Sequence, residues 1–283
     1  MTSDASFGEP LSGADSAEKA AGALLTVDLD AVAANYAMLK AAAAGAEVSA
    51  VVKADAYGLG MEPVAERLWM EGCRTFFVAD AAEGAALRAA LPKAVIYVLN
   101  GLFSGTAALY AEYGLRPCLG SLAELAEWRG AGAPQPAALH FDTGMNRLGM
   151  SAGDAAALAA DGTLTEGVEV ALVMSHLACS DEAAHPQNAR QLGRFTDVLA
   201  VLKRRFPDAK ASLANSGGIY LGEDYRFDLV RPGVSLYGGN PFTGRANPFR
   251  PVVTARARIL AVRDVPAGET AGYAATWEAA RPA

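Results

Sequence analysis

The sequence predicts an α/β fold, a (β/α)8 TIM-like barrel followed by the beginning of a C-terminal β-domain. Short apolar runs alternate with helical patterns along most of the chain, which indicates a parallel sheet covered on both faces. Eight such units fit a closed barrel, and a chain of 283 residues can contain one. An open doubly wound sheet would more often carry a glycine-rich fingerprint after its first strand, and this sequence has none there.

The first residues predict little regular structure. Residues 1–22 are rich in alanine, serine, glycine and acidic residues, which is typical of a disordered acidic tail. Their acidic character argues against a signal peptide. A short strand is expected at 24–27, and Asp28 provides helix-start chemistry for a helical pattern that runs to the alanines before Gly45.

The barrel is expected to occupy residues 23–245. Its strand candidates are the apolar runs near residues 48–53, 74–79, 94–99, 115–119, 137–142, 168–175, 211–214 and 227–231. Helical patterns lie between them, for instance at 63–70, 81–90, 122–129, 155–160 and 187–206. Residues 246–283 read as a linker and the first strands of an incomplete β-domain, with a candidate returning strand at 273–277.

Bulk properties exclude several classes of function. The net charge is −7 and no Lys/Arg cluster stands out, which argues against a nucleic-acid partner or an anionic membrane surface. No apolar run approaches membrane-spanning length. The three cysteines are widely spaced without a metal-binding pattern, which suits a reducing compartment. We therefore expect a cytoplasmic protein with neither a nucleic-acid nor a membrane partner.

The most informative residue is Lys53, which ends the apolar run that begins at Val48. A lysine in this position usually needs a partner for its amine. A desolvated amine loses part of its proton affinity and becomes a better nucleophile or base, and such lysines form Schiff bases with carbonyl compounds. The structural alternative is a strand-end lysine whose amine reaches into solvent.

The segment Ala-Val-Val-Lys-Ala-Asp-Ala-Tyr-Gly-Leu-Gly, residues 50–60, closely resembles the pyridoxal 5′-phosphate attachment segment of alanine racemases. Further motifs extend the resemblance over roughly residues 25–277. It implies conversion of L-alanine to D-alanine for peptidoglycan, with Lys53 as the Schiff-base lysine and the base on the D-face. It also implies a homodimer for the complete enzyme. By resemblance Tyr57 hydrogen-bonds the cofactor phosphate; otherwise it would be a capping aromatic.

A second motif, His-Phe-Asp-Thr-Gly-Met-Asn-Arg-Leu-Gly-Met, closes the fifth predicted strand at residues 140–150. The resemblance places Arg147 beside the phenolic oxygen of the cofactor and the substrate carboxylate, whereas a loop salt bridge is the alternative. In some racemases a carbamylated lysine supports this arginine. His140 occupies that place, so a bound anion or another hydrogen bond would have to stand in. His176 ends the sixth strand and by resemblance packs near the pyridine ring, although a lone histidine there is usually a core residue.

The seventh and eighth strands are followed by Asn-Ser-Gly-Gly and Arg-Pro-Gly-Val-Ser, at residues 215–218 and 231–235. Small residues expose backbone N–H groups, and barrels of this kind usually bind phosphate in these two loops. By resemblance the phosphate is held by Ser216, Gly233 and Val234. Arg231 would face the pyridine nitrogen and leave it unprotonated, which limits the ring as an electron sink.

The resemblance departs at the C-terminal end. Racemisation needs a proton-transfer group on each face of the substrate, and in the family the second is a tyrosine within Gly-Tyr-Ala-Asp-Gly of the β-domain. Tyr273 lies in Gly-Tyr-Ala-Ala-Thr-Trp, which lacks the Asp-Gly, and is a poor match. We expect the chain to end before that tyrosine and to racemise slowly or not at all, because such a group contributes roughly 10² to 10⁴ in rate.

Two rival functions stay open on the sequence. One is a non-catalytic protein that handles pyridoxal phosphate, similar to the single-barrel homeostasis proteins. The strands expected after Pro251 argue against it, because a self-sufficient barrel does not need them. The other is a Schiff-base aldolase that uses Lys53 without a cofactor.

Overall fold

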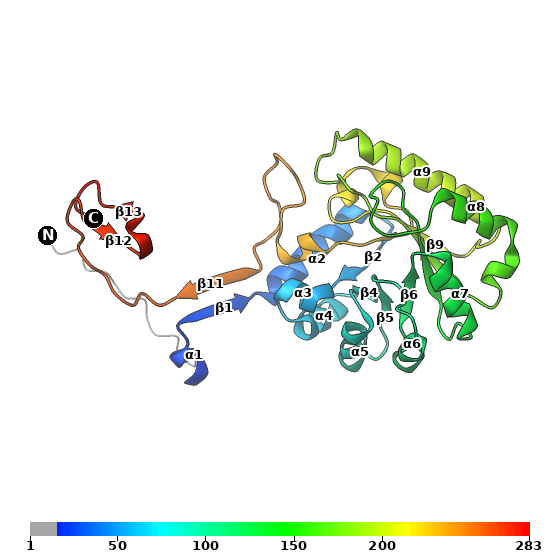
Figure 1. The fold of residues 1–283 in the computed structure, drawn as a ribbon, viewed down its shortest axis with the longest axis horizontal. Coiled ribbons are helices and arrows are strands. Elements are labelled where there is room, and N and C mark those ends of the chain that lie inside the picture. Colours follow the sequence, from blue (N-terminus) through cyan, green and yellow to red (C-terminus); the bar gives the residue numbers. More distant parts are fainter. Residues whose placement is uncertain (1–15) are drawn as a thin grey trace. The chain divides into compact units, whose positions relative to one another are not determined.

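The structure is a computed structural model that describes residues 16–283 (Figure 1). The acidic tail predicted for residues 1–22 lies outside the described residues up to residue 15, and α1 (Ser16–Ala20) is a short helix. Two compact units can be distinguished. One is Val27–Val253, here called the barrel unit; the other consists of Thr254–Ala283 and the described residues before Val27.

The barrel unit contains a continuous parallel sheet in sequence order. Its strands are β3 (Ala50–Val51), β4 (Thr75–Val78), β5 (Val95–Val98), β6 (Arg116–Leu119), β7 (Ala137–His140), β8 (Val170–Met174) and β9 (Lys210–Ser212). At its end β10 (Leu229–Val230) pairs in parallel with β2 (Glu47–Val48), one residue before β3. The backbone N–H groups of Asp228 and Arg231 donate to the carbonyls of Ala211 and Ala214, which joins β10 to β9. The cylinder is therefore closed, and the predicted (β/α)8 barrel is confirmed.

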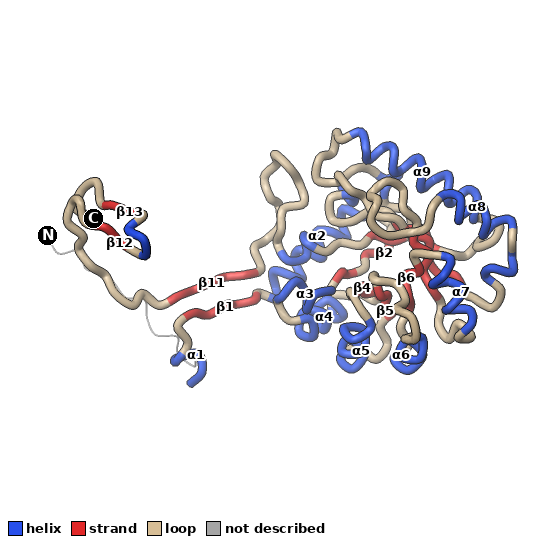
Figure 2. The backbone as a smooth tube through the Cα atoms, viewed as in Figure 1, coloured by secondary structure: helices blue, strands red, loops and turns tan. Residues whose placement is uncertain are grey.

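Helices lie around the outside of this cylinder (Figures 1 and 2). They are α2 (Leu29–Ala43), α4 (Met61–Met70), α5 (Ala81–Ala90), α6 (Ala107–Tyr113), α7 (Leu122–Gly130), α8 (Ala152–Ala160) and α9 (Pro186–Leu202). Side chains of Asp28, Asp80 and Ser151 accept hydrogen bonds from the first backbone N–H groups of their helices, which fixes where those helices begin. The predicted helical patterns are confirmed, except that α9 ends four residues before residue 206.

The strands separate two apolar layers, because successive side chains of a strand point to opposite faces. In β4, Phe76 and Val78 pack in the layer beneath the helices, whereas Phe77 packs inside the barrel. The inner layer consists of Val51, Phe77, Tyr97, Cys118, Ala138, Leu172, Met174 and Leu229. The barrel is therefore filled by side chains and leaves room for a site only at its ends.

The smaller unit contains β11 (Val253–Ala257), which pairs with β1 (Ala23–Val27). The short strands β12 (Thr270–Ala271) and β13 (Trp277–Glu278) pair antiparallel with each other around the 3-10 turn Tyr273–Ala275. The prediction of a returning strand at 273–277 is therefore wrong, because Tyr273–Ala275 form a 3-10 turn. The strand after Pro251, β11, pairs with β1 instead. Among the described residues, no helix combines the length and hydropathy needed to cross a membrane.

Candidate active site

Strand alternation aims four of the predicted residues into one mouth of the barrel. Each follows by two positions a side chain of the inner layer, and residues two apart share a face of a strand. The inner-layer residues are Val51, Ala138, Met174 and Leu229, and the residues two positions later are Lys53, His140, His176 and Arg231. Lys53, His140, His176 and Arg231 lie at or just beyond the carboxyl ends of their strands, which is where barrels of this kind carry their sites.

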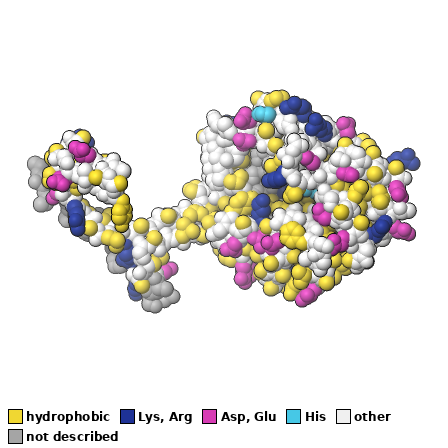
Figure 3. All heavy atoms as spheres, viewed as in Figure 1, with side chains coloured by type: hydrophobic (Ala, Val, Ile, Leu, Met, Phe, Trp, Pro, Cys, Tyr) yellow, Lys and Arg dark blue, Asp and Glu magenta, His cyan; other side chains and the backbone are white. Residues whose placement is uncertain are grey.

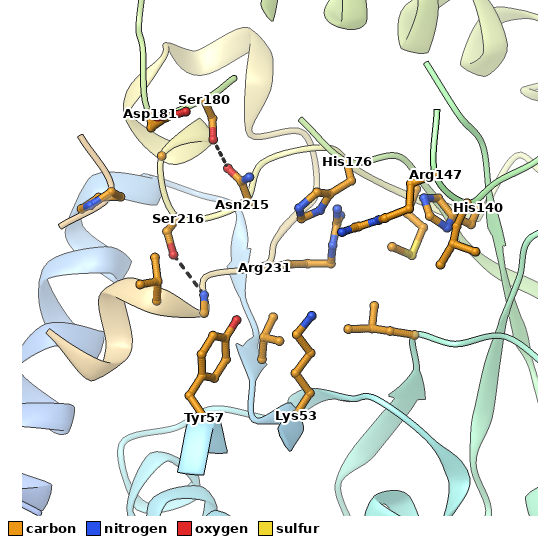
Figure 4. A pocket seen from close by; sticks show the side chains of 18 of the residues that line it. Lys53, Tyr57, His140, Arg147, His176, Ser180, Asp181, Asn215, Ser216 and Arg231 are labelled. Carbon is orange, nitrogen blue, oxygen red and sulfur yellow. Dashed lines mark hydrogen bonds between the residues drawn. The ribbon is translucent and has the colours of Figure 1, made fainter. Parts of the chain in front are cut away.

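These side chains line a cavity of about 510 Å³ at that mouth (Figure 4). The volume lies in the range of sites for small molecules and cofactors. The predicted site residues that line it are Lys53, Tyr57, Arg147, His176, Ser216, Arg231, Gly233 and Val234. His140 is also in the wall. Three cationic side chains and the carboxylate of Asp181 therefore share the lining, and this balance favours an anionic ligand.

A left-handed turn connects Lys53 to Tyr57. This turn is α3 (Lys53–Gly58), in which the four successive non-glycine residues 54–57 have φ between 52° and 59°. A left-handed conformation costs L-residues roughly 1–2 kcal/mol each, so the surroundings must hold it in place. The side chains of Lys53 and Tyr57, at the two ends of this turn, both point into the cavity (Figure 4).

The loop that carries Arg147 is organised by Asp142. The Asp142 carboxylate accepts hydrogen bonds from the backbone N–H groups of Gly144, Met145 and Asn146 at 2.8 to 3.1 Å. Partial burial alone would raise the pKa of Asp142, but these donors hold it below its ordinary value. A backbone bond of 2.8 Å from Met150 to the carbonyl of His140 closes the loop. Arg147 is thus presented to the cavity from a fixed loop.

Arg231 is buried, with 3% of its surface exposed. Its guanidinium donates to the hydroxyl of Ser212 and to the carbonyls of Ser175 and Leu213. Burial lowers its pKa to about 10, so it keeps its charge at neutral pH. A guanidinium has five N–H donors, and these three acceptors leave some of them available toward the cavity. None of the ion pairs among the described residues involves Arg231.

The two histidines of the cavity are neutral at physiological pH. Burial, followed by the charges of Arg231 and Arg147, lowers the pKa of His140 to about 4. The same causes lower the pKa of His176 to about 3. His176 is held from behind by Gln191, whose side-chain amide donates to the His176 carbonyl at 2.8 Å and accepts from the N–H of Ala178. The cavity therefore owes its positive charge to lysine and arginine.

The loops after β9 and β10 form a cradle in the cavity wall. The Ser216 hydroxyl oxygen accepts from the N–H groups of Gly233 at 3.0 Å and Ser235 at 3.4 Å, which ties the loops together. A Cβ atom on Gly233 would lie 2.4 Å from the Tyr57 hydroxyl oxygen, so this tyrosine packs on bare backbone. Burial raises the pKa of Tyr57 and keeps it a hydrogen-bond donor. The Tyr57 and Ser216 hydroxyls beside the exposed backbone of Gly233 suit a phosphate group. The cationic side chains in the rest of the cavity suit a pyridoxal ring with a carboxylate substrate.

Some lining residues were missed by the sequence argument. Asn100 directly follows the predicted strand at 94–99, so the strand-end argument could have found it. Ser180 and Asp181 follow the sixth strand at a greater distance, and Asn240 lies beyond the eighth. No periodicity or motif marks these three positions, because they reach the cavity through irregular connections.

Comparisons with known proteins identify the family to which the chain is similar. The family described as "Alanine racemase, N-terminal domain" matches residues 27–241. An alanine racemase from Methylobacterium sp. (strain 4-46) is 52% identical, covering 92% of this chain and 71% of that protein. The crystal structure of alanine racemase from Bartonella henselae, with covalently bound pyridoxal phosphate, gives a TM-score of 0.86 at 40% identity, covering 93% of this chain and 73% of that one. Biosynthetic alanine racemase from Pseudomonas aeruginosa gives 0.84 at 34% identity, covering 92% and 73%.

Proposed function

Because this chain belongs to the alanine racemase family, we propose that it interconverts L- and D-alanine with pyridoxal 5′-phosphate bound in the barrel-mouth cavity. The observation that carries the proposal is that eight predicted residues from five separate segments of the chain line one cavity with three cationic side chains. The covalently bound cofactor of the Bartonella henselae protein, at 40% identity, supports the choice of cofactor.

The cavity residues have distinct proposed roles. Lys53 attaches the cofactor, while Tyr57, Ser216, Gly233 and Val234 hold its phosphate. Arg231 donates to the ring nitrogen and His176 packs near the ring. When bound, pyridoxal phosphate supplies an electron sink for the charge left on Cα after its proton is lost.

The substrate is held and deprotonated by two groups on this chain. Arg147 binds the carboxylate through its planar donor fork, which orients the Cα–H bond. Lys53 then removes the α-proton of D-alanine, or returns it to Cα on the same face. Inversion requires a second proton-transfer group on the opposite face, and we assign none within the described residues. A positioned acid–base group contributes roughly 10² to 10⁴ in rate, so the 283-residue chain alone should invert alanine slowly.

Isotope exchange tests this proposal directly. The purified chain, loaded with pyridoxal phosphate, should exchange the α-proton of D-alanine with ²H₂O much faster than that of L-alanine. Borohydride reduction should leave a phosphopyridoxyl group on Lys53, and Lys53→Ala should abolish both results. Binding of the cofactor without exchange on either enantiomer would instead indicate a non-catalytic cofactor-handling protein. No cofactor-dependent modification of Lys53 would contradict the proposal outright.

The wider setting follows from the same family membership. We propose that the protein acts in the cytoplasm, that the complete enzyme is a homodimer, and that its D-alanine serves peptidoglycan synthesis. Sedimentation of the purified chain tests the dimer. D-alanine auxotrophy on gene deletion tests the biosynthetic role, since an enzyme used only to degrade alanine would give no such requirement.

A further inference from the structure

The strained turn after Lys53 is bonded to a carboxylate of the neighbouring β/α unit. Glu83, in α5, accepts a hydrogen bond from the backbone N–H of Asp55 through Oε1 at 3.1 Å. Its other oxygen accepts from the backbone N–H of Ala79, just after β4, at 2.8 Å. One side chain therefore links the left-handed turn to the carboxyl end of the adjacent strand.

The remaining hydrogen bonds of the turn are local. The N–H of Ala56 donates to Val52 at 2.9 Å, and the N–H of Gly60 donates to the carbonyl of Asp55 at 3.0 Å. The Asp55 carboxylate accepts from the N–H of Met61 at 2.7 Å. Over the part of the chain that is described, the bond to Glu83 is the one hydrogen bond between the backbone of residues 54–57 and a residue outside 52–61.

We propose that Glu83 is a positioning residue for the active site. It holds the left-handed turn against the barrel and thereby fixes the directions of Lys53 and Tyr57, which stand at its two ends. A left-handed conformation of L-residues persists only when its surroundings restrain it, and a carboxylate bond to a backbone N–H is among the stronger restraints. Glu83 does not line the cavity, so it acts through the turn. The functional part of this inference rests on the proposed cofactor chemistry.

The fold provides a matched control two β/α units later. Glu124, in α7, accepts from the backbone N–H groups of Leu102 and Gly120, each at 3.2 Å. Glu124 thus also links a helix to two loops at strand ends through a pair of hydrogen bonds, both to Oε2. Its loop carries neither Lys53 nor Tyr57, and contributes Asn100 to the cavity wall. Removing Glu124 therefore costs a comparable pair of hydrogen bonds elsewhere in the barrel.

Hydrogen–deuterium exchange on the cofactor-free chain tests the restraint without any activity measurement. In Glu83→Ala the amides of residues 54–60 should exchange about 10- to 100-fold faster, the ratio expected for losing a hydrogen bond to a charged group. Glu83→Gln, which preserves the shape of α5 but replaces one acceptor oxygen, should give a smaller increase in the same segment. Glu124→Ala should leave that segment unchanged and loosen residues 100–103.

A second measurement connects the restraint to the site. Titration of each variant with pyridoxal phosphate, followed by borohydride reduction, should show about tenfold weaker attachment to Lys53 in Glu83→Ala and a clearly smaller loss in Glu124→Ala, whose loop contributes Asn100 to the cavity wall. Faster exchange at 54–60 with unchanged attachment would overturn the positioning role, and so would equal losses in the two alanine variants. Unchanged exchange at 54–60 would overturn the restraint itself. If even the wild-type chain attaches no cofactor, the proposed function fails, while the exchange data still decide whether Glu83 holds the turn.

Discussion

At the scale of single residues, the site depends on a glycine as much as on residues with functional side chains. Gly233 brings bare backbone against the Tyr57 hydroxyl, and Ser216 accepts the Gly233 N–H. A methyl group here would occupy the space in which the tyrosine lies. The cradle formed by the loops after β9 and β10 therefore depends on the close packing of Tyr57 against the Gly233 backbone.

We expect Gly233→Ala to displace the Tyr57 hydroxyl and weaken pyridoxal phosphate binding by about tenfold, the loss of roughly one hydrogen bond to a charged group. Fluorescence titration with the cofactor measures this. Gly193→Ala is the control, because no atom lies within 4 Å of a Cβ built at this position of α9. An alanine in a helix interior stabilises slightly, so this variant should bind the cofactor normally. Equal affinities for the two variants would contradict the cradle.

At the scale of elements, loops at the carboxyl ends of the strands are held by side chains that accept several backbone N–H groups. Asp142 does this for the loop that carries Arg147, and Glu83 does it for the turn after Lys53. An irregular backbone leaves its N–H groups without the partners of a regular helix or strand, and a carboxylate satisfies more than one of them. Loop precision in this barrel therefore comes from acidic residues outside the cavity.

Asp142→Ala should loosen the Arg147 loop and raise the D-alanine concentration needed for half-maximal α-proton exchange by about tenfold, since charge-assisted hydrogen bonds are lost. Cofactor affinity should fall less than this, because the loops after β3, β9 and β10, which carry the attachment lysine and the proposed phosphate contacts, are untouched. Ser151→Ala breaks the capping box at the start of α8, next to this loop, and is the matched control. If both variants shift the half-saturating concentration equally, Asp142 has no specific effect on Arg147.

At the scale of the whole molecule, the buried histidines of the site should make the fold less stable at acidic pH. The barrel buries the Arg231 guanidinium, which forms no ion pair with any described residue, and holds two neutral histidines near it. An ordinary histidine has a pKa of about 6.5 in the unfolded chain, so between that value and the folded value the unfolded state binds more protons. The free energy of unfolding should therefore decrease as the pH falls through this interval.

For His140 the interval extends from about pH 6.5 down to about pH 4, and the full loss would be about 3 kcal/mol. Urea unfolding of the cofactor-free chain between pH 7 and pH 4.5 measures it. His140→Gln removes this titration and should flatten the dependence, while His176 maintains part of it. A pH dependence identical in the wild-type and His140→Gln chains would show that His140 is not held neutral by the fold.

Periodicity along the chain was enough to establish the barrel and to place Lys53, His140, His176 and Arg231 at strand ends, because neighbours at spacings of two or of three to four residues are encoded locally. Motif resemblance added the family and the cavity residues Tyr57, Arg147, Ser216, Gly233 and Val234, but not Asn100, Ser180, Asp181 or Asn240. Barrel closure decided the rest. Residues 54–57 contain no glycine to signal a left-handed turn, and the side chain that restrains it lies 28 positions away from Asp55. Likewise the contact of Gly233 with Tyr57 exists only because β10 returns to β2, and no local pattern can encode a meeting between residues so far apart in the chain.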